Sequence, residues 1–198
     1  FAVRGVEPNR EMREAGERFL SGYPGFTSIV GTAEATTLPS ASAGLVVVGQ
    51  AFHWFDRARC RPEFVRILKP GGGLAVIWNE RDTARSPFLR DYEALIRTWC
   101  LPRGQVEHNR VSDADLAAFF APEPVSLNHF TYRQRFDLPG LEGRLLSSSY
   151  TPEVGNPNHE PMLAALRELF DRYQRDGFVD FPYDTQVYYG RLSPLPAV

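Results

Sequence analysis

The first half of the chain alternates short apolar runs with stretches in which apolar residues recur at helical spacing. The runs at residues 2–6, 26–30, 45–48 and 74–78 predict strands. After the first of them, Met12, Ala15 and Phe19 recur at helical spacing and predict a helix, with Pro8 in its first turn. Strands alternating with helices in this way are typical of parallel βα units.

Two of these segments allow sharper predictions. The unbroken run Leu45-Val46-Val47-Val48 is typical of a strand that is covered on both faces. A helix over 63–68 is expected to stop at Lys69-Pro70-Gly71-Gly72, where the chain turns into the next strand. Pro62 then has to lie in the first turn of that helix, because an interior proline costs ~3 kcal/mol.

The second half contains more helical patterns and fewer apolar runs. Ser86 followed by Pro87 predicts a helix start ahead of an apolar face that reaches Trp99, and Ser112 with Asp115 predicts a capping box. Further helices are predicted at 138–146 and 161–175, the latter closed by Gly177, and strands at 125–136 and 185–192. Two late strands separated by helices favour an antiparallel pair at the end of a mostly parallel sheet.

Composition narrows the class of protein. The chain has 198 residues, 43% of them hydrophobic, which suits one domain with a sizeable core. A net charge of −2 gives no electrostatic support for nucleic-acid binding, and no apolar run approaches the ~20 residues that cross a bilayer. Cys60 and Cys100 match no metal spacing, so we expect two reduced, buried thiols in a cytoplasmic protein.

Polar and aromatic residues gather after three of the predicted strands. Glu7 ends the first, Gly31-Thr32-Ala33-Glu34 follows the second, and Gly49-Gln50-Ala51-Phe52-His53-Trp54-Phe55-Asp56 follows the third. In an open α/β sheet, ligands bind outside the carboxyl ends of the strands. We therefore expect these three segments to converge on one crevice.

Four motifs in this order resemble one known family. They are Val6-Glu7-Pro8-Asn9 with Met12, Gly31-Thr32-Ala33-Glu34 with Leu38-Pro39, Ala51-Phe52-His53-Trp54-Phe55-Asp56, and Arg66-Ile67-Leu68-Lys69-Pro70-Gly71-Gly72. Together they are similar to the class I S-adenosylmethionine-dependent methyltransferases, of the branch called methyltransferase type 11 or trans-aconitate-methyltransferase-like. The motifs cover about the first 80 residues, and the later half resembles this branch more loosely.

The resemblance implies an α/β fold, a Rossmann-like sheet that is mostly parallel with a C-terminal antiparallel pair. It implies a single, incomplete domain, with a cofactor-binding half at 1–80 and an acceptor-side half at 81–198. The implied cofactor is S-adenosylmethionine. The positions implied to contact it are Glu7, Pro8, Met12, Ala33, Glu34, Gln50, Ala51, His53 and Trp54.

Each position carries an implied role. Glu7 would accept hydrogen bonds from both ribose hydroxyls, and Ala33 with Glu34 would border the adenine. Gln50 and Ala51 would lie under the methionine portion, while His53 and Trp54 would face the reacting methyl group or the acceptor. His53 is the candidate base, because histidine titrates near neutral pH. A packed histidine, a solvated loop glutamate at 34 and core aromatics at 54 and 55 remain the structural alternatives.

The chain departs from the family in two places. Gly44 stands where an acidic residue is common, and the glycine-rich turn that holds the methionine carboxylate is absent together with its strand. That strand belongs in the centre of the sheet, beside the strand that ends at Glu7. We therefore expect roughly 40 to 60 further residues at the start of the natural protein, the size of one or two βα units. The 198 residues alone are expected to bind cofactor weakly and to be inactive.

The expected partner is a small-molecule acceptor, with no nucleic acid and no membrane involved. Methyl transfer from a sulfonium requires alignment above all, and an ionised carboxylate acceptor needs no base. The acceptor pocket is expected in the second half, among Trp99, Phe120, Tyr150, Tyr188 and Tyr189, with an anionic substrate held by Arg81, Arg85, Arg133 or Arg144. Two other functions stay open, a non-catalytic relative that binds or scaffolds and a nicotinamide-dependent oxidoreductase.

Overall fold

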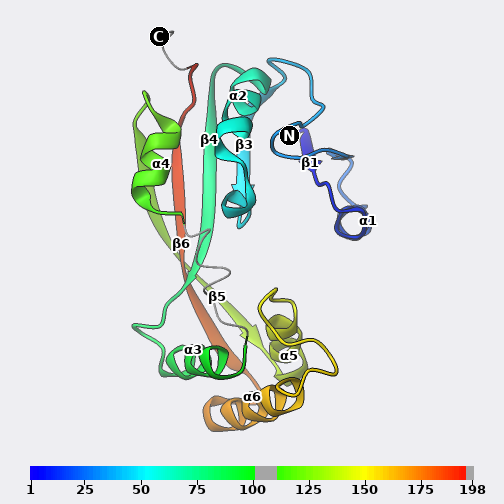
Figure 1. Ribbon diagram of the computed structural model, residues 1–198, viewed down its shortest axis with the longest axis vertical. Helices are drawn as coiled ribbons and strands as arrows, with labels where there is room; N and C mark the ends of the chain where they lie inside the picture. Colours follow the sequence, from blue (N-terminus) through cyan, green and yellow to red (C-terminus); the bar gives the residue numbers. More distant parts are fainter. Residues whose placement is uncertain (101–110, 195–198) are drawn as a thin grey trace. The chain divides into compact units, whose positions relative to one another are not determined.

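The computed structural model describes residues 1–100 and 111–194 (Figure 1). Its elements in chain order are β1 (Val3–Val6), α1 (Arg10–Phe19), β2 (Phe26–Ile29), β3 (Ala43–Gly49), the 3-10 turn η1 (Phe52–Trp54), α2 (Arg57–Ile67), β4 (Leu68–Arg81), α3 (Pro87–Trp99), α4 (Asp113–Phe120), β5 (Val125–Phe136), α5 (Leu138–Leu146), α6 (His159–Tyr173) and β6 (Val179–Arg191). Of the described residues, 1–77, 111–127 and 188–194 form one compact unit, and 78–100 with 128–187 form a second.

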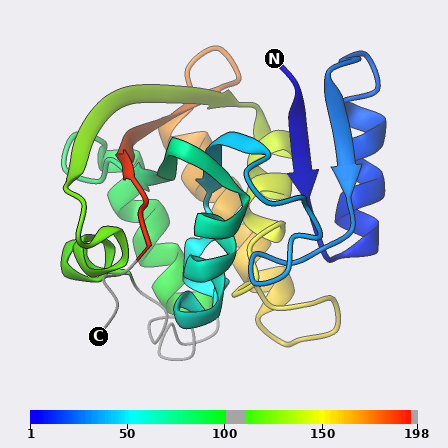
Figure 2. The same cartoon turned by 90° about the horizontal axis from the view of Figure 1, so that it is seen from above.

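The strands are parallel early in the chain and antiparallel late. β1 pairs with β2 in parallel, from Val3 opposite Phe26 to Val6 opposite Ile29, and Figure 2 shows α1 beside this pair. β3 pairs with β4 in parallel, within a four-stranded sheet of order β3-β4-β6-β5. β5 and β6 run in opposite directions, since contacts join His129 to Asp184 and Arg133 to Asp180. The predicted α/β fold with its antiparallel C-terminal pair is therefore confirmed.

The described strands form two separate sheets. Within residues 1–100 and 111–194, no strand pairing links the β1-β2 sheet to the four-stranded sheet. Leu45 and Val47 of β3 are 50% and 57% exposed, so the expectation that this run is covered on both faces is wrong for these residues. Only Val48 of this apolar run is fully buried.

Helix α2 begins earlier than its apolar pattern indicates. Asp56 caps it, the carboxylate accepting a hydrogen bond from the Arg59 N–H at 3.2 Å, and the helix runs on to Ile67. Pro62 therefore lies in the helix interior and not in the first turn, which corrects the prediction. The helix ends before Lys69 as expected. The residues after it bulge from the β3-β4 ladder, which pairs Ala43 with Leu68 and resumes with Leu45 opposite Gly73.

Helix α1 differs from its predicted form at both its start and its apolar face. Asn9 is its N-cap, its side chain accepting from the Met12 N–H at 3.0 Å, so Pro8 precedes the helix and is not part of its first turn. Met12 and Phe19 are 64% and 84% exposed, and none of the helix residues is buried. The helical spacing was correct, but within the described residues nothing covers its apolar side.

The second unit is built around α3, α5 and α6. Their buried side chains, among them Leu89, Tyr92, Leu141 and Leu166, form one hydrophobic cluster together with Phe181 of β6. The predicted Ser86 cap is confirmed, and the Ser112–Asp115 capping box is confirmed at α4 in the first unit. α6 ends at Tyr173, so Gly177 does not close it, contrary to the prediction.

Both cysteines are free and buried, as expected. Burial, reinforced by the nearby carboxylates of Glu34 and Asp56, raises the pKa of the Cys60 thiol to about 12. This thiol is therefore protonated and unreactive at neutral pH. Among the described helices, none has the length and apolar character needed to cross a membrane.

Candidate functional site

The carboxyl ends of β1 and β2 lie side by side because the two strands are parallel and in register. The Glu7 N–H donates to the Ile29 carbonyl at 3.1 Å and extends the pairing by one residue. Glu7 therefore stands next to the loop that begins at Gly31. The expectation that these two segments share one edge of the sheet is confirmed.

The Glu7 carboxylate is half-buried and already has one protein partner. Its Oε1 accepts a hydrogen bond from the Asn9 N–H at 2.8 Å, which anchors the side chain over the start of α1. Oε2 has no hydrogen-bond partner within residues 1–100 and 111–194. A fixed carboxylate with one free oxygen at a strand end suits a diol, which offers two O–H donors.

The loop after β2 is joined to the segment after β3 by Glu34. Its Oε1 accepts a hydrogen bond from the Asp56 N–H at 3.0 Å. Burial by itself raises the pKa of Glu34, but the backbone N–H groups of Glu34 and Asp56, the Thr32 hydroxyl and Arg59 together bring it below its ordinary value. Glu34 is therefore ionised at neutral pH and is a hydrogen-bond acceptor only.

Two side chains in the segment after β3 are not buried in the core. Gln50 has a φ of +55°, and its N–H donates to the Ile77 carbonyl at 3.0 Å, so the chain turns sharply at the strand end. Phe52 is then fully buried, whereas Trp54 is 62% exposed and His53 is half-buried. The alternative of a core tryptophan is wrong for Trp54, although Phe55 does pack, against Phe52 and Phe64.

His53 and Trp54 lie close together, with ring centroids 4.7 Å apart. Burial lowers the pKa of His53 from its ordinary value of 6.5, because a charged imidazolium loses hydration there. The imidazole is therefore neutral at pH 7 and has a nitrogen lone pair available to accept a proton. Within the described residues, no group of three or more His, Cys, Asp or Glu side chains is arranged to hold a metal ion.

The structure brings together some of the predicted site residues and leaves others separate. Ala33 and Glu34 adjoin the segment from Gln50 to Asp56, while Pro8 and Met12 are exposed near Glu7 at the start of α1. Within the described part of the chain, no hydrogen bond or ion pair joins Glu7 to residues 50–54. The contact of all nine positions with one cofactor stays a prediction.

Three of the four arginines proposed to hold an acceptor have carboxylate partners. Arg81 pairs with Glu93, Arg85 with Asp82 at 3.7 Å, and Arg133 with Asp180 at 3.3 Å. Arg144 instead bonds hydroxyl groups, the Ser148 Oγ at 3.3 Å and the Tyr183 hydroxyl at 3.5 Å. Of the aromatic candidates, Phe120 and Tyr188 are buried core residues, Trp99 and Tyr150 are partly buried, and Tyr189 is half exposed.

Sequence reasoning missed the residues that hold the loop after Glu34 in place. The Glu63 carboxylate of α2 accepts from the Thr36 N–H at 2.8 Å and from two nitrogens of Arg66, each at 2.7 Å. Arg66, followed by the Thr36 bonds, lowers the pKa of Glu63 to about 2. Glu63 and Arg66, three residues apart on a helix, form a common surface pair, so the sequence carries no signal of the contact to Thr36.

Buried Arg61, also on α2, was missed as well. Its guanidinium donates to the carbonyls of Phe119 at 2.9 Å and Ser193 at 3.0 Å, and to that of Ala121. These bonds tie α2 to the end of α4 and to the segment after β6. Nothing in the local sequence separates Arg61 from the exposed arginines of the same helix.

Comparison with known proteins identifies the family of the chain. Residues 1–76 match the family described as a methyltransferase domain. An uncharacterized methyltransferase of Schizosaccharomyces pombe is 30% identical over 176 residues, which cover 87% of this chain and 68% of the yeast protein. One from Mycobacterium tuberculosis is 41% identical over 94 residues, covering 48% of this chain and 37% of the mycobacterial protein.

Solved structures show the same fold. A protein described as a type II methyltransferase from Anaeromyxobacter dehalogenans superposes with a TM-score of 0.61 at 21% identity, over 98% of this chain and 81% of that one. The YcgJ protein of Bacillus subtilis gives a TM-score of 0.55 at 18% identity, over 97% and 82%. The fold is thus the Rossmann-like fold of class I methyltransferases. The chain belongs to the class I methyltransferase family.

Proposed function

We propose that this protein transfers the methyl group of S-adenosylmethionine to a small-molecule acceptor, with a carboxylate as the favoured acceptor class. The observation that carries the proposal is the meeting of strand-end loops in the first unit. Glu7 stands beside the loop after β2, and Glu34 of that loop is bonded to Asp56 after β3. Cofactors of α/β proteins bind at such carboxyl ends.

The described residues fit the adenosine part of the cofactor. Glu7 would accept hydrogen bonds from the ribose hydroxyls through its free oxygen, held in place by the Asn9 N–H. Glu34, ionised and with only one oxygen bonded to Asp56, would accept from the exocyclic amine of adenine. Met12, which is 64% exposed on α1, would offer apolar surface to the nucleoside.

Trp54 and His53 would face the reacting end. S-adenosylmethionine supplies an electrophilic methyl group on a positively charged sulfonium, so the protein's task is alignment of the acceptor. The exposed Trp54 ring would exclude water on one side of the acceptor. His53, neutral because burial lowers its pKa, would take a proton from a hydroxyl or amine acceptor. A carboxylate acceptor would bypass this step.

Isothermal titration tests the cofactor assignment. S-adenosylmethionine is titrated into the protein at its natural length, together with Glu7→Gln and the matched control Glu11→Gln, an exposed glutamate of α1. We expect Glu7→Gln to weaken binding by about tenfold or more, the effect of a lost charged hydrogen bond, and Glu11→Gln to have no effect. Absence of binding by the wild type would favour a non-catalytic relative.

The acceptor class requires a separate assay. Labelled cofactor is incubated with the protein and a panel of small carboxylic acids, phenols and amines. Transfer of label to a carboxylate at a rate insensitive to His53→Gln would support the favoured class. Label that appears only in added macromolecules would contradict the assignment of a small-molecule substrate.

A further inference from the structure

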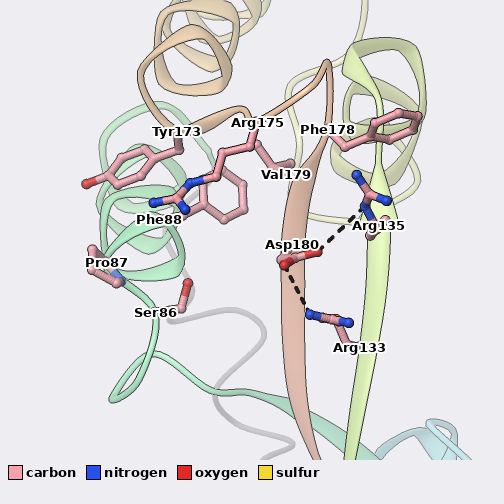
Figure 3. Close-up of a pocket in the computed structure, with 10 residues that line it drawn as sticks. All are labelled: Ser86, Pro87, Phe88, Arg133, Arg135, Tyr173, Arg175, Phe178, Val179 and Asp180. Carbon is pink, nitrogen blue, oxygen red and sulfur yellow. Dashed lines mark hydrogen bonds and ion pairs between the residues drawn. The ribbon is translucent and has the colours of Figure 1, made fainter.

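The second unit contains an open cavity of about 450 Å³, and its lining includes Arg133, one of the arginines named above as candidates to hold an anionic acceptor. Its walls come from the start of α3, from β5, from the turn after α6 and from the start of β6 (Figure 3). Three arginines line it, Arg133, Arg135 and Arg175, and Asp180 is the only acidic residue among its described lining residues. Phe88 and Val179, both buried, provide apolar surface.

Local backbone structure holds Arg175 at the rim. The four residues Arg175-Asp176-Gly177-Phe178 form a tight turn with φ of +52° at Asp176 and +78° at Gly177. Two backbone hydrogen bonds, of 2.8 and 3.0 Å, join Arg175 to Phe178 across it. Positive φ at both central positions is the type I′ geometry that Asp-Gly favours. The cationic side chain therefore belongs to a tight turn closed by two backbone hydrogen bonds.

Arg133 and Arg135 occupy the other wall. They are two residues apart on β5, so they lie on the same face of the strand. Arg133 is 3.3 Å from one oxygen of Asp180, and Arg135 is 3.9 Å from the other (Figure 3). Arg135 also lies 4.5 Å from the ring centroid of Phe178, a cation–π contact that fixes its orientation.

The cavity carries an excess of positive charge. Three guanidinium groups face one carboxylate, which leaves a formal charge of +2. Within residues 1–100 and 111–194, the Arg175 side chain has no ion pair or hydrogen bond, and Figure 3 shows it directed towards Phe88 and Tyr173. The Tyr173 hydroxyl donates to Asp91 at 2.8 Å, so it is engaged elsewhere, and its pKa is raised by that contact.

We propose that this cavity binds a small organic dianion, such as a phosphate monoester or a dicarboxylate, with an apolar portion. Arg175 and Arg133 bind the anionic groups, because guanidinium matches the geometry of phosphate and carboxylate oxygens. The apolar portion packs on Phe88 and Val179. The proposal does not depend on methyl transfer, since every residue that carries it belongs to the second unit.

The test titrates phenyl phosphate into the full chain by isothermal calorimetry, with succinate and inorganic phosphate as comparison probes. Arg175→Gln and Arg133→Gln are expected to weaken binding by about tenfold or more, the effect of one lost charged hydrogen bond. Arg97→Gln, an exposed arginine of α3 outside the cavity, is the matched control and leaves binding unchanged. Tighter binding of phenyl phosphate than of inorganic phosphate indicates use of the apolar wall.

The variant Asp180→Asn best distinguishes anion binding in the cavity from a purely structural role of Asp180. This change removes the carboxylate that competes for Arg133 and Arg135, so binding of the dianion becomes tighter. A purely structural role of Asp180 predicts no gain. Equal binding by wild type and Arg175→Gln, weaker binding by Asp180→Asn, or no saturable binding by the wild type would each overturn the proposal. Circular dichroism confirms that each variant is folded.

Discussion

The carboxylate of Glu34 accepts a hydrogen bond from the backbone N–H of Asp56 at 3.0 Å. This single bond joins the loop after β2 to the residue that caps α2. It also leaves one oxygen of Glu34 uncommitted to Asp56. The two strand-end loops are thus held together by a side chain that the proposed function assigns to adenine recognition.

Replacing Glu34 with Gln separates its structural hydrogen bond to Asp56 from its proposed recognition of adenine. The amide oxygen still accepts from Asp56, so we expect stability at pH 7 to fall only slightly, by the contribution of the charge that lowers the pKa of Glu34. The charge that would bind the adenine amine is lost, and we expect affinity for S-adenosylmethionine to fall by about tenfold, as for other charged hydrogen bonds. Calorimetric titration measures the affinity. Unchanged affinity alongside unchanged stability would remove Glu34 from the proposed site.

Glu63 is predicted to make stability dependent on acid pH. Its pKa is lowered from 4.5 to about 2, mainly by Arg66 and then by Thr36. The stabilisation is therefore fully present above pH 4.5, decreases as the pH falls and is lost below about pH 2. At pH 7, Glu63→Gln should lower the free energy of unfolding by about 1–2 kcal/mol.

Urea denaturation at several pH values measures this effect. The difference between wild type and Glu63→Gln should shrink steadily below pH 4.5. Glu11→Gln, at an exposed position, serves as the control and should unfold like the wild type at every pH. A difference that stays constant down to pH 2 would show that the charge of Glu63 does not contribute.

Tyr92 and Tyr188 form a matched pair for testing buried hydroxyl groups. Tyr92 is fully buried and its hydroxyl has no hydrogen-bond partner within the described residues, whereas the Tyr188 hydroxyl donates to Asp113 at 2.7 Å. We expect Tyr92→Phe to leave stability unchanged or to raise it by about 1 kcal/mol, and Tyr188→Phe to lower it by a similar amount. Thermal and urea unfolding measure both. A marked loss of stability in Tyr92→Phe would reveal a partner.

The proposed role of His53 predicts a pH profile that depends on the acceptor. Burial lowers the pKa of His53 from 6.5, so the imidazole is neutral at pH 7 and becomes protonated only as the pH falls through that lowered pKa. With a hydroxyl acceptor, kcat should therefore decrease on the acid side, and His53→Gln should reduce kcat by about 100-fold. With a carboxylate acceptor, neither effect is expected. Identical profiles for both acceptors would exclude His53 as the base.

The sequence by itself determined the local structure wherever that structure depends on interactions between residues close together in the chain. Ser86 with Pro87, and Ser112 with Asp115, define helix starts because their side chains satisfy backbone N–H groups a few residues away. Helix α5 and strand β5 have the predicted bounds for the same reason, since period and flanking residues are local signals. The order of the strand-end motifs likewise carried the resemblance to the methyltransferase family, which the comparisons confirm.

Features that depend on contacts between residues far apart in the sequence were determined only by the tertiary structure. Pro62 lies inside α2 because Asp56, itself bonded to Glu34, caps a helix that starts at Arg57, well before the 63–68 segment that the apolar pattern indicates. The exposure of Leu45 and Val47 follows from the absence of a neighbouring strand in the described residues. Arg133, one surface cation among many in the sequence, lines a cavity because β5 and β6 run antiparallel and the turn at 175–178 closes beside them. Strand pairing and burial of this kind depend on the whole fold, and the local sequence around these residues carries no signal of them.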